Sequence, residues 1–306
     1  MRLQTDSAPW WPGWRATAEL VRLPAVLSVP GDVLAGAAAG RWPSGRRTAG
    51  LVGSSACLYW AGMALNDWAD REEDAADRPW RPIPSGRVPA QSALCLAAVL
   101  TGAGVGLARA AGGRRGLRTA MAIAATVWAY DLGAKRTSAG PLVMAAARGL
   151  NVLLGCSGTA AVIPAATIAG HTAAVTAISA HEVDGGPAAR RAAQAALAAT
   201  AVIAALSAAQ SALPGSPAGP QAAGGADRIA GAVLTAAYAA DVGRAQFAAA
   251  RDPDPAVVQR AVSAGILGLI PLQGGLLASA GAARLGWAVA TLWPLARRLS
   301  RKVSPT

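Results

Sequence analysis

The sequence predicts an all-α, polytopic membrane protein folded as one helical bundle. Apolar residues make up 53% of the 306-residue chain and charged residues 14%, and the mean hydropathy is +0.35. A soluble domain carries about a quarter charged residues. The apolar residues lie in stretches of about 20, the length that an α-helix needs to cross a bilayer. No β-strand periodicity interrupts them, and the abundant Ala and Gly suit helices that pack closely in lipid.

About nine transmembrane helices are expected along the chain. In chain order, the candidate spans cover residues 22–40, 48–65, 89–111, 116–132, 141–159, 162–181, 190–213, 228–249, 257–280 and 283–297. The last candidate is the weakest, because it is short and ends among four cationic residues at 297, 298, 301 and 302. We therefore expect nine spans, with eight or ten as the alternatives.

The bundle forms a single membrane domain, residues 21–299, flanked by two short segments. The N-terminal segment, residues 1–20, carries Trp10, Trp11 and Trp14, side chains typical of the bilayer interface. It lacks the basic region, apolar core and cleavage site of a signal peptide. Residues 300–306 form a basic C-terminal tail.

The net charge of +12 is distributed in the manner of a membrane protein. The Arg residues cluster between apolar segments rather than along one helix or tail, and no alternation of basic and aromatic residues suggests a groove for bases. Charge that flanks membrane spans explains this pattern better than nucleic-acid binding. The expected partner is the lipid bilayer, with no nucleic acid.

Three polar loops are expected on one face of the membrane. Residues 66–88, 130–140 and 181–189 follow the second, fourth and sixth spans, and alternate loops of a bundle lie on the same side. Together with the N-terminus, this set holds more Lys and Arg than the opposite set. By the positive-inside rule, the protein is a multi-pass cell-membrane protein with these loops in the cytoplasm.

The first polar loop holds six of the sixteen acidic residues, all within residues 67–77, a segment called here the acidic knot. If the helix of the second span continues through it, Asn66, Asp70 and Asp74 lie four apart on one face, with Asp67 on an adjacent face. Such carboxylates repel each other unless a cation lies among them, and Mg²⁺ prefers hard oxygen ligands shared with substrate phosphates. The alternative is a solvated acidic helix end.

Arginines follow the acidic knot at once, at Arg78 and Arg81. A guanidinium group suits bidentate contact with phosphate, and the neighbouring prolines and glycine stiffen the loop. Carboxylates for a metal and arginines for phosphate within twenty residues are what a diphosphate substrate requires.

These residues form a recognisable pattern. N-D-x-x-D-x-x-x-D from Asn66, followed by R-P-x-R-P-I-P-S-G to Gly86, closely resembles the first aspartate-rich motif of the UbiA superfamily of intramembrane prenyltransferases. Tyr130 to Arg136 resembles the family's connector after the fourth span. The resemblance implies a helical bundle with a central cavity that opens to the bilayer.

The implied activity is that of a transferase of alkyl (prenyl) groups. It moves a polyprenyl group from an allylic polyprenyl diphosphate to a small lipophilic acceptor, aromatic or otherwise electron-rich, with Mg²⁺ as cofactor. The catalytic candidates are Asp67, Asp70, Asp74 and Lys135. The candidates for diphosphate binding are Arg78, Arg81, Tyr130, Lys135, Arg136, Arg148 and Asn151. The candidate metal ligands are Asn66, Asp70, Asp74, Glu182 and Asp184.

Two of these assignments depend on position in the membrane. Arg148 and Asn151 lie inside the fifth span, where an ionisable group usually faces the protein interior; the alternative is a structural hydrogen-bonding role. Asp32 lies in the first span, where it either contacts substrate or pairs with an arginine such as Arg22 or Arg148. His171, inside the sixth span, is interpreted as a hydrogen-bonded core residue.

The third polar loop departs from the family pattern. Where the family carries a second aspartate-rich motif, only Glu182 and Asp184 remain, two residues apart. Either they form a shortened motif or a second metal is lost, so the alternative function is a catalytically reduced UbiA-like protein that binds or moves an isoprenoid lipid. A CDP-alcohol phosphotransferase is a further alternative, but the chain lacks the D-G-x-x-D-A-R opening of those enzymes.

Overall fold

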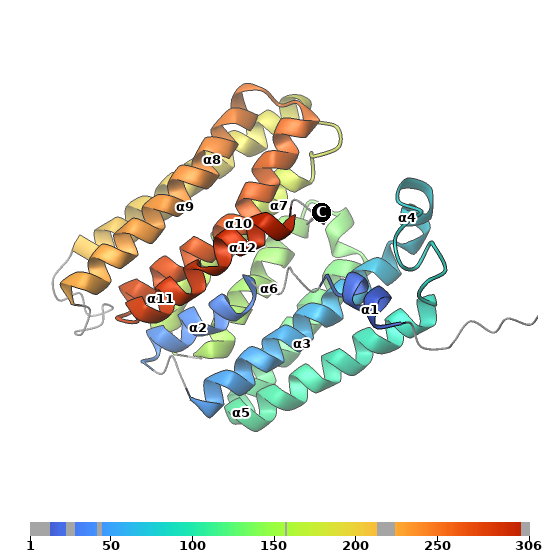
Figure 1. The fold of residues 1–306 in the computed structure, drawn as a ribbon, viewed down its shortest axis with the longest axis horizontal. Coiled ribbons are helices and arrows are strands. Elements are labelled where there is room, and N and C mark those ends of the chain that lie inside the picture. The colour runs from blue at the N-terminus through green and yellow to red at the C-terminus, as the bar shows by residue number, and fades with distance from the viewer. Residues whose placement is uncertain (1–12, 23–27, 42–44, 157, 213–223, 301–306) are drawn as a thin grey trace, which may run out of the picture.

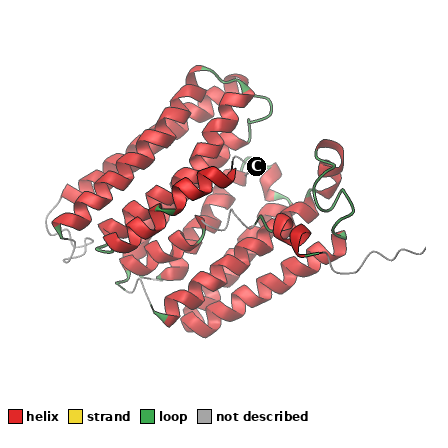
Figure 2. Cartoon of the chain, viewed as in Figure 1, coloured by secondary structure: helices red, strands yellow, loops and turns green. Residues whose placement is uncertain are grey.

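A computed structural model of the protein describes residues 13–22, 28–41, 45–156, 158–212 and 224–300. In these residues the chain forms twelve α-helices and no strand (Figures 1 and 2). By length and composition, four of the described segments can cross a membrane: Ala90–Leu132, Thr159–Ser179, Gly186–Ala209 and Pro255–Ser279. The predicted all-helical, multi-span fold class is confirmed.

Helices α6 (Gly140–Gly155) and α7 (Val162–Ser179) pack against each other and link two groups of helices (Figure 1). On one side α3 (Arg46–Ala69) runs beside α5 (Ala90–Leu132), and on the other α8 (Gly186–Ala212), α9 (Gly225–Arg251) and α10 (Pro255–Ser279) pack together. The short helix α2 (Pro30–Ala39) packs against α6. This arrangement places the middle of α6 and α7 between the two sides.

Glycines allow α2 and α6 to approach each other closely. A Cβ atom added at Gly36 would lie 1.9 Å from the backbone oxygen of Val152, and one added at Gly155 would lie 2.0 Å from the backbone oxygen of Val33. Small residues at helix contacts are the usual means of close packing in lipid. The contact fixes the position of α6 beside α2.

Some predicted span limits change in the structure. The first span, expected at 22–40, is helical only from Pro30 to Ala39, and residues 23–27 lie outside the described residues. The expected spans at 89–111 and 116–132 are both present as two helical segments within α5, which the chain joins by turning back at Gly113, whose φ of 65° suits glycine. The two segments lie side by side, because Trp128 Nε1 donates a hydrogen bond of 3.2 Å to Thr101 Oγ1, 27 residues earlier. The last span divides into α11 (Ala283–Ala290) and α12 (Leu292–Ser300).

The two flanking segments are only partly described. Helix α1 (Trp14–Leu20) belongs to the predicted N-terminal segment, but residues 1–12, with Trp10 and Trp11, lie outside the described residues. The same holds for the predicted C-terminal tail from residue 301 onward. The division into these segments therefore stays a prediction.

The acidic knot does not continue the helix of the second span, so that expectation was wrong. Helix α3 ends at Ala69, Asp70 takes a non-helical conformation (φ −92°, ψ 5°), and α4 begins at Arg71 and ends at Asp77. Backbone hydrogen bonds of 2.9 Å from Asp70 N to Asn66 O and 2.8 Å from Asp74 N to Asp70 O still preserve the four-residue spacing. The break turns α4 away from the bundle (Figure 1).

Candidate active site

A cavity of about 440 Å³ lies inside the bundle. Its apolar walls include Leu58, Ile123 and Leu269, from α3, α5 and α10. At one end it is lined by Asn66, Arg78 and Arg81. A second cavity of about 360 Å³ has Asp70, Lys135 and Arg136 in its wall and shares Asn66 and Tyr130 with the first. The two cavities therefore adjoin at this end, called here the mouth.

The three polar loops meet at the mouth, as the alternation of loops predicts. Lys135 Nζ of the second loop lies 2.7 Å from a carboxylate oxygen of Asp70 in the first loop. Arg136 lies 3.5 Å from the same carboxylate. Glu182 of the third loop lines the first cavity together with Arg78.

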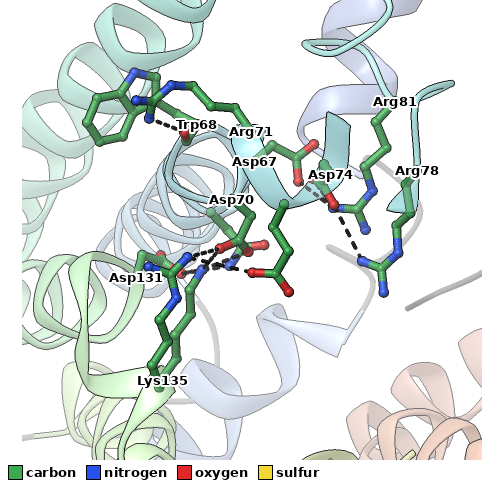
Figure 3. A network of polar contacts seen from close by, with 12 residues as sticks. Asp67, Trp68, Asp70, Arg71, Asp74, Arg78, Arg81, Asp131 and Lys135 are labelled. Atoms are coloured by element: carbon green, nitrogen blue, oxygen red, sulfur yellow. Dashed lines mark hydrogen bonds and ion pairs between the residues drawn. The ribbon is translucent and has the colours of Figure 1, made fainter. Parts of the chain in front are cut away.

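The buried carboxylates of the acidic knot are paired with arginines (Figure 3). Arg81 Nη1 lies 2.8 Å from Asp74 Oδ2 and 3.4 Å from Asp67 Oδ1. Arg22, at the end of α1, also lies 3.4 Å from Asp67, and Arg78 lies 3.7 Å from Asp74. Sequence reasoning considered Arg22 only as a partner of Asp32, because nothing in the sequence brings residue 22 to residue 67.

Asp131 belongs to the site, although sequence reasoning assigned it no role. Asn66 Nδ2 donates a hydrogen bond of 2.9 Å to Asp131 Oδ1, and Lys135 Nζ lies 3.8 Å from the same carboxylate. Because the amide nitrogen of Asn66 is bonded to Asp131, its amide oxygen is left for another partner. The available signal was local: Asp131 precedes Lys135 by four residues, one helical turn.

The two carboxylates of the third loop lie in different surroundings. Glu182 is half-buried and lines the first cavity. Its Oε2 atom is buried and has no hydrogen-bond partner in the described part of the chain. Burial raises the pKa of Glu182, and nearby Arg78 acts in the opposite direction. Asp184 is exposed and does not line either of these cavities.

The donor atoms at the mouth are of the kind that Mg²⁺ takes. Among the described residues, no three His, Cys, Asp or Glu side chains are grouped closely enough to hold a metal alone. Mg²⁺, however, usually binds through one or two carboxylates and completes its shell with water and substrate phosphate. The amide oxygen of Asn66, the carboxylate of Asp70 and the unpartnered Glu182 Oε2 fit this pattern.

Arg148 and Asn151 take part in a separate network. Arg148 Nε lies 3.0 Å from Asp32 Oδ2, and Asn151 Nδ2 donates to the same oxygen at 2.9 Å. Of the two arginines considered for Asp32, the structure pairs it with Arg148, while Arg22 contacts Asp67. The structure thus does not bring Arg148 or Asn151 into the ion pairs at the mouth.

His171 is a hydrogen-bonded core residue, as predicted. Its Nε2 atom lies 3.0 Å from the backbone oxygen of Gly265, and its Nδ1 atom lies 2.9 Å from the hydroxyl of Tyr238. A carbonyl oxygen only accepts hydrogen bonds, so Nε2 is the protonated nitrogen of the ring.

Comparison with known proteins identifies a matching family and several relatives. The model of the UbiA prenyltransferase family matches residues 26–211. Digeranylgeranylglyceryl phosphate synthase of Methanopyrus kandleri is 41% identical over 99 residues, 31% of this chain and 35% of the relative. The bacteriochlorophyll synthase 33 kDa chain of Cereibacter sphaeroides is 40% identical over 52 residues, 17% of each chain. The matches thus span about a third or less of these relatives' lengths.

A solved structure shares the fold over nearly the whole chain. The structure of a UbiA homologue from Archaeoglobus fulgidus bound to DMAPP and Mg²⁺ has a TM-score of 0.61 and 15% sequence identity. The likeness covers 90% of this chain and 99% of that one. At this identity the likeness establishes the fold.

Proposed function

The chain belongs to the UbiA prenyltransferase family, and on that premise we propose that it transfers a polyprenyl group from an allylic isoprenoid diphosphate to an electron-rich, lipophilic acceptor. The reaction depends on Mg²⁺. The observation that carries this proposal is the meeting of carboxylates and cations from three loops at the mouth of an apolar cavity. An isoprenoid diphosphate has the matching form, with an apolar tail and an anionic head.

The residues at the mouth divide into two groups by charge. Asn66, Asp70 and Asp74 would hold Mg²⁺, with Asp67 in support and Glu182 from the third loop. When bound, Mg²⁺ neutralises the diphosphate and strengthens it as a leaving group. Asp131 holds the amide of Asn66 by a hydrogen bond, and partners of this kind orient metal ligands and tune metal affinity.

The cations at the mouth would bind and stabilise the diphosphate. Arg78, Arg81, Lys135 and Arg136 surround the acidic knot, and Tyr130 lines both cavities. As the allylic C–O bond breaks, negative charge accumulates on the departing oxygen. Preorganised cations aimed at developing charge are commonly the largest single catalytic contribution. Lys135 is the catalytic candidate among them, because it lies between Asp70 and Asp131.

The cavity accounts for the remaining requirements of the reaction. Its apolar wall would hold the start of the isoprenoid tail and exclude water, so that the allylic cation meets the acceptor. The bilayer supplies the lipophilic substrates. The excess of Lys and Arg in the mouth loops supports a cytoplasmic position for them.

A second candidate function is a UbiA-like protein that binds or moves an isoprenoid lipid without catalysis. The exposed position of Asp184 favours it, since only Glu182 of the third loop lines the cavity. The other residues at the mouth are compatible with both candidate functions. Catalysis is therefore the property that separates them.

Release of diphosphate tests the proposal. The purified protein in lipid nanodiscs is incubated with geranylgeranyl diphosphate, Mg²⁺ and a panel of lipophilic phenols and alcohols as acceptors, and diphosphate is measured with and without EDTA. Mg²⁺-dependent release above that from empty nanodiscs supports the transferase. Binding of the donor with no release under any metal condition would identify the lipid-binding alternative.

A further inference from the structure

A second polar cluster lies deeper in the cavity than the mouth. Asp32, with a relative exposure of 0%, accepts hydrogen bonds from Asn151 at 2.9 Å and from Gln273 Nε2 at 2.6 Å, and it is paired with Arg148. Ser55 donates a hydrogen bond of 2.6 Å to Asn151 Oδ1. The cluster therefore joins α2, α3, α6 and α10.

This cluster is separate from the diphosphate end. Ser55 precedes Asn66 by eleven residues on α3, which corresponds to about 16 Å along a helix. None of the hydrogen bonds or ion pairs of the described residues joins Asp32, Arg148 or Asn151 to the acidic knot. The cluster therefore forms a network apart from the ion pairs at the mouth.

The cluster nevertheless faces the cavity. Ser55, Arg148 and Asn151 all line it. Arg148 contacts Asp32 through Nε and Nη2, and within the described residues no hydrogen bond engages its Nη1 atom. This atom is therefore available to a molecule in the cavity.

Tyr59 adds a second unused polar group. It lies one helical turn from Ser55 on the mouth side and also lines the cavity. Its hydroxyl makes no hydrogen bond with any described residue. A phenol has one donor and acceptor capacity, and leaving such a group unpaired in an apolar cavity is unfavourable. Tyr59 Oη and Arg148 Nη1 thus remain for a ligand.

The charge balance indicates what kind of group they receive. Asp32 and Arg148 cancel each other's charge, and His171, which also lines the cavity, is hydrogen-bonded on both ring nitrogens. An added anion would compete with Asp32 for Arg148, and an added cation would find no unpaired carboxylate there. An uncharged oxygen satisfies both groups without an unbalanced charge in a low-dielectric site.

We propose that Tyr59 and Arg148 form an acceptor subsite that binds an uncharged oxygen, a hydroxyl or carbonyl group, of the second substrate. Calling the ligand an acceptor rests on the proposed function. Tyr59 lies two helical turns deeper than Asn66, so the subsite holds the acceptor just below the diphosphate. Asp32, Asn151 and Ser55 act as positioning residues, because they hold Arg148 and the wall around it.

Three single-ring probes of one shape test the charge requirement. p-Cresol carries an uncharged hydroxyl, 4-methylbenzoate carries an anion, and p-xylene carries no polar group. Their binding to the protein in lipid nanodiscs is measured by equilibrium dialysis, with binding to empty nanodiscs subtracted. p-Cresol is expected to bind most tightly. Tighter binding of 4-methylbenzoate, or equal binding of p-xylene, overturns the proposal.

Tyr59→Phe tests the residue itself. The hydroxyl that it removes has no partner among the described residues, so the variant keeps the fold. Loss of one ligand hydrogen bond is expected to weaken p-cresol about 5-fold and to leave p-xylene unchanged. Unchanged p-cresol affinity contradicts the subsite.

Tyr238→Phe is the matched control, because it removes a hydroxyl that is bonded to His171. It is expected to lower the midpoint of thermal unfolding and to leave p-cresol binding unchanged. Equal weakening in both variants would also overturn the proposal. No prenyl donor or Mg²⁺ is present in these measurements, so their failure is distinct from a failure of diphosphate release.

Discussion

Lys135 Nζ lies 2.7 Å from the carboxylate of Asp70, a residue 65 positions earlier in the chain. Both side chains are mostly buried, with 12% and 19% of their surface exposed. This ion pair joins the second polar loop to the acidic knot at the point where α3 ends and α4 begins. The pair therefore holds Asp70, the residue between the two helices, against the second polar loop at the mouth.

Asp70→Ala is expected to lower Mg²⁺-dependent release of diphosphate by about 100-fold or more, because it removes a metal ligand and leaves Lys135 without its nearest partner. Release from geranylgeranyl diphosphate in nanodiscs measures the effect. Asp77→Ala is the control, since Asp77 belongs to the same acidic knot but is exposed; its rate is expected to stay within about twofold. Equal rates for the two variants contradict the assignment.

Asp131→Ala is expected to raise the Mg²⁺ concentration for half-maximal rate by about 10-fold, because Asn66 loses the partner that orients its amide. Saturating Mg²⁺ is expected to restore much of the rate. A Mg²⁺ titration of the initial rate measures this, with Glu72→Ala, an exposed acid paired with Arg71, as the control. A lower maximal rate with an unchanged half-saturation point would exclude an orienting role.

The third loop is tested by two conservative changes. Glu182→Gln is expected to raise the Mg²⁺ requirement about 10-fold, because Glu182 lines the cavity and its Oε2 atom has no hydrogen-bond partner among the described residues. Asp184→Asn is expected to have no such effect, because Asp184 is exposed. Mg²⁺ titrations of both variants compare them. The opposite result would make Asp184 the ligand of this loop.

The contact between α2 and α6 can be tested through stability. A Cβ atom at Gly155 would lie 2.0 Å from a backbone oxygen of α2, so Gly155→Ala forces the helices apart. The expected loss in the free energy of unfolding is about 1–3 kcal/mol. Gly170→Ala on α7 is the control, since its Cβ would meet nothing within 4 Å. Denaturant titration in detergent compares the two, and an equal effect would exclude a close contact.

Much of the architecture was predictable because it depends on local composition. Long, continuously apolar segments without strand-like alternation satisfy their backbone hydrogen bonds in lipid as helices, so the all-helical class followed from hydropathy. The acidic knot and its Arg78–Arg81 tail were likewise visible, because carboxylates, amide and guanidinium groups lie within twenty residues of one another. The alternation of loops was sufficient to predict that three of them meet.

The sequence by itself determined the fold class, the metal-type donor atoms of the knot and the family pattern, since each is a property of contiguous residues. Only the tertiary structure decided which charges meet. It paired Asp67 with Arg22, Asn66 with Asp131 and Asp32 with Arg148, across separations of 45, 65 and 116 residues. It also broke the helix at Asp70 and separated Glu182 from Asp184. The physical reason is that an ion pair depends on distance in space, which helix packing sets and spacing along the chain does not.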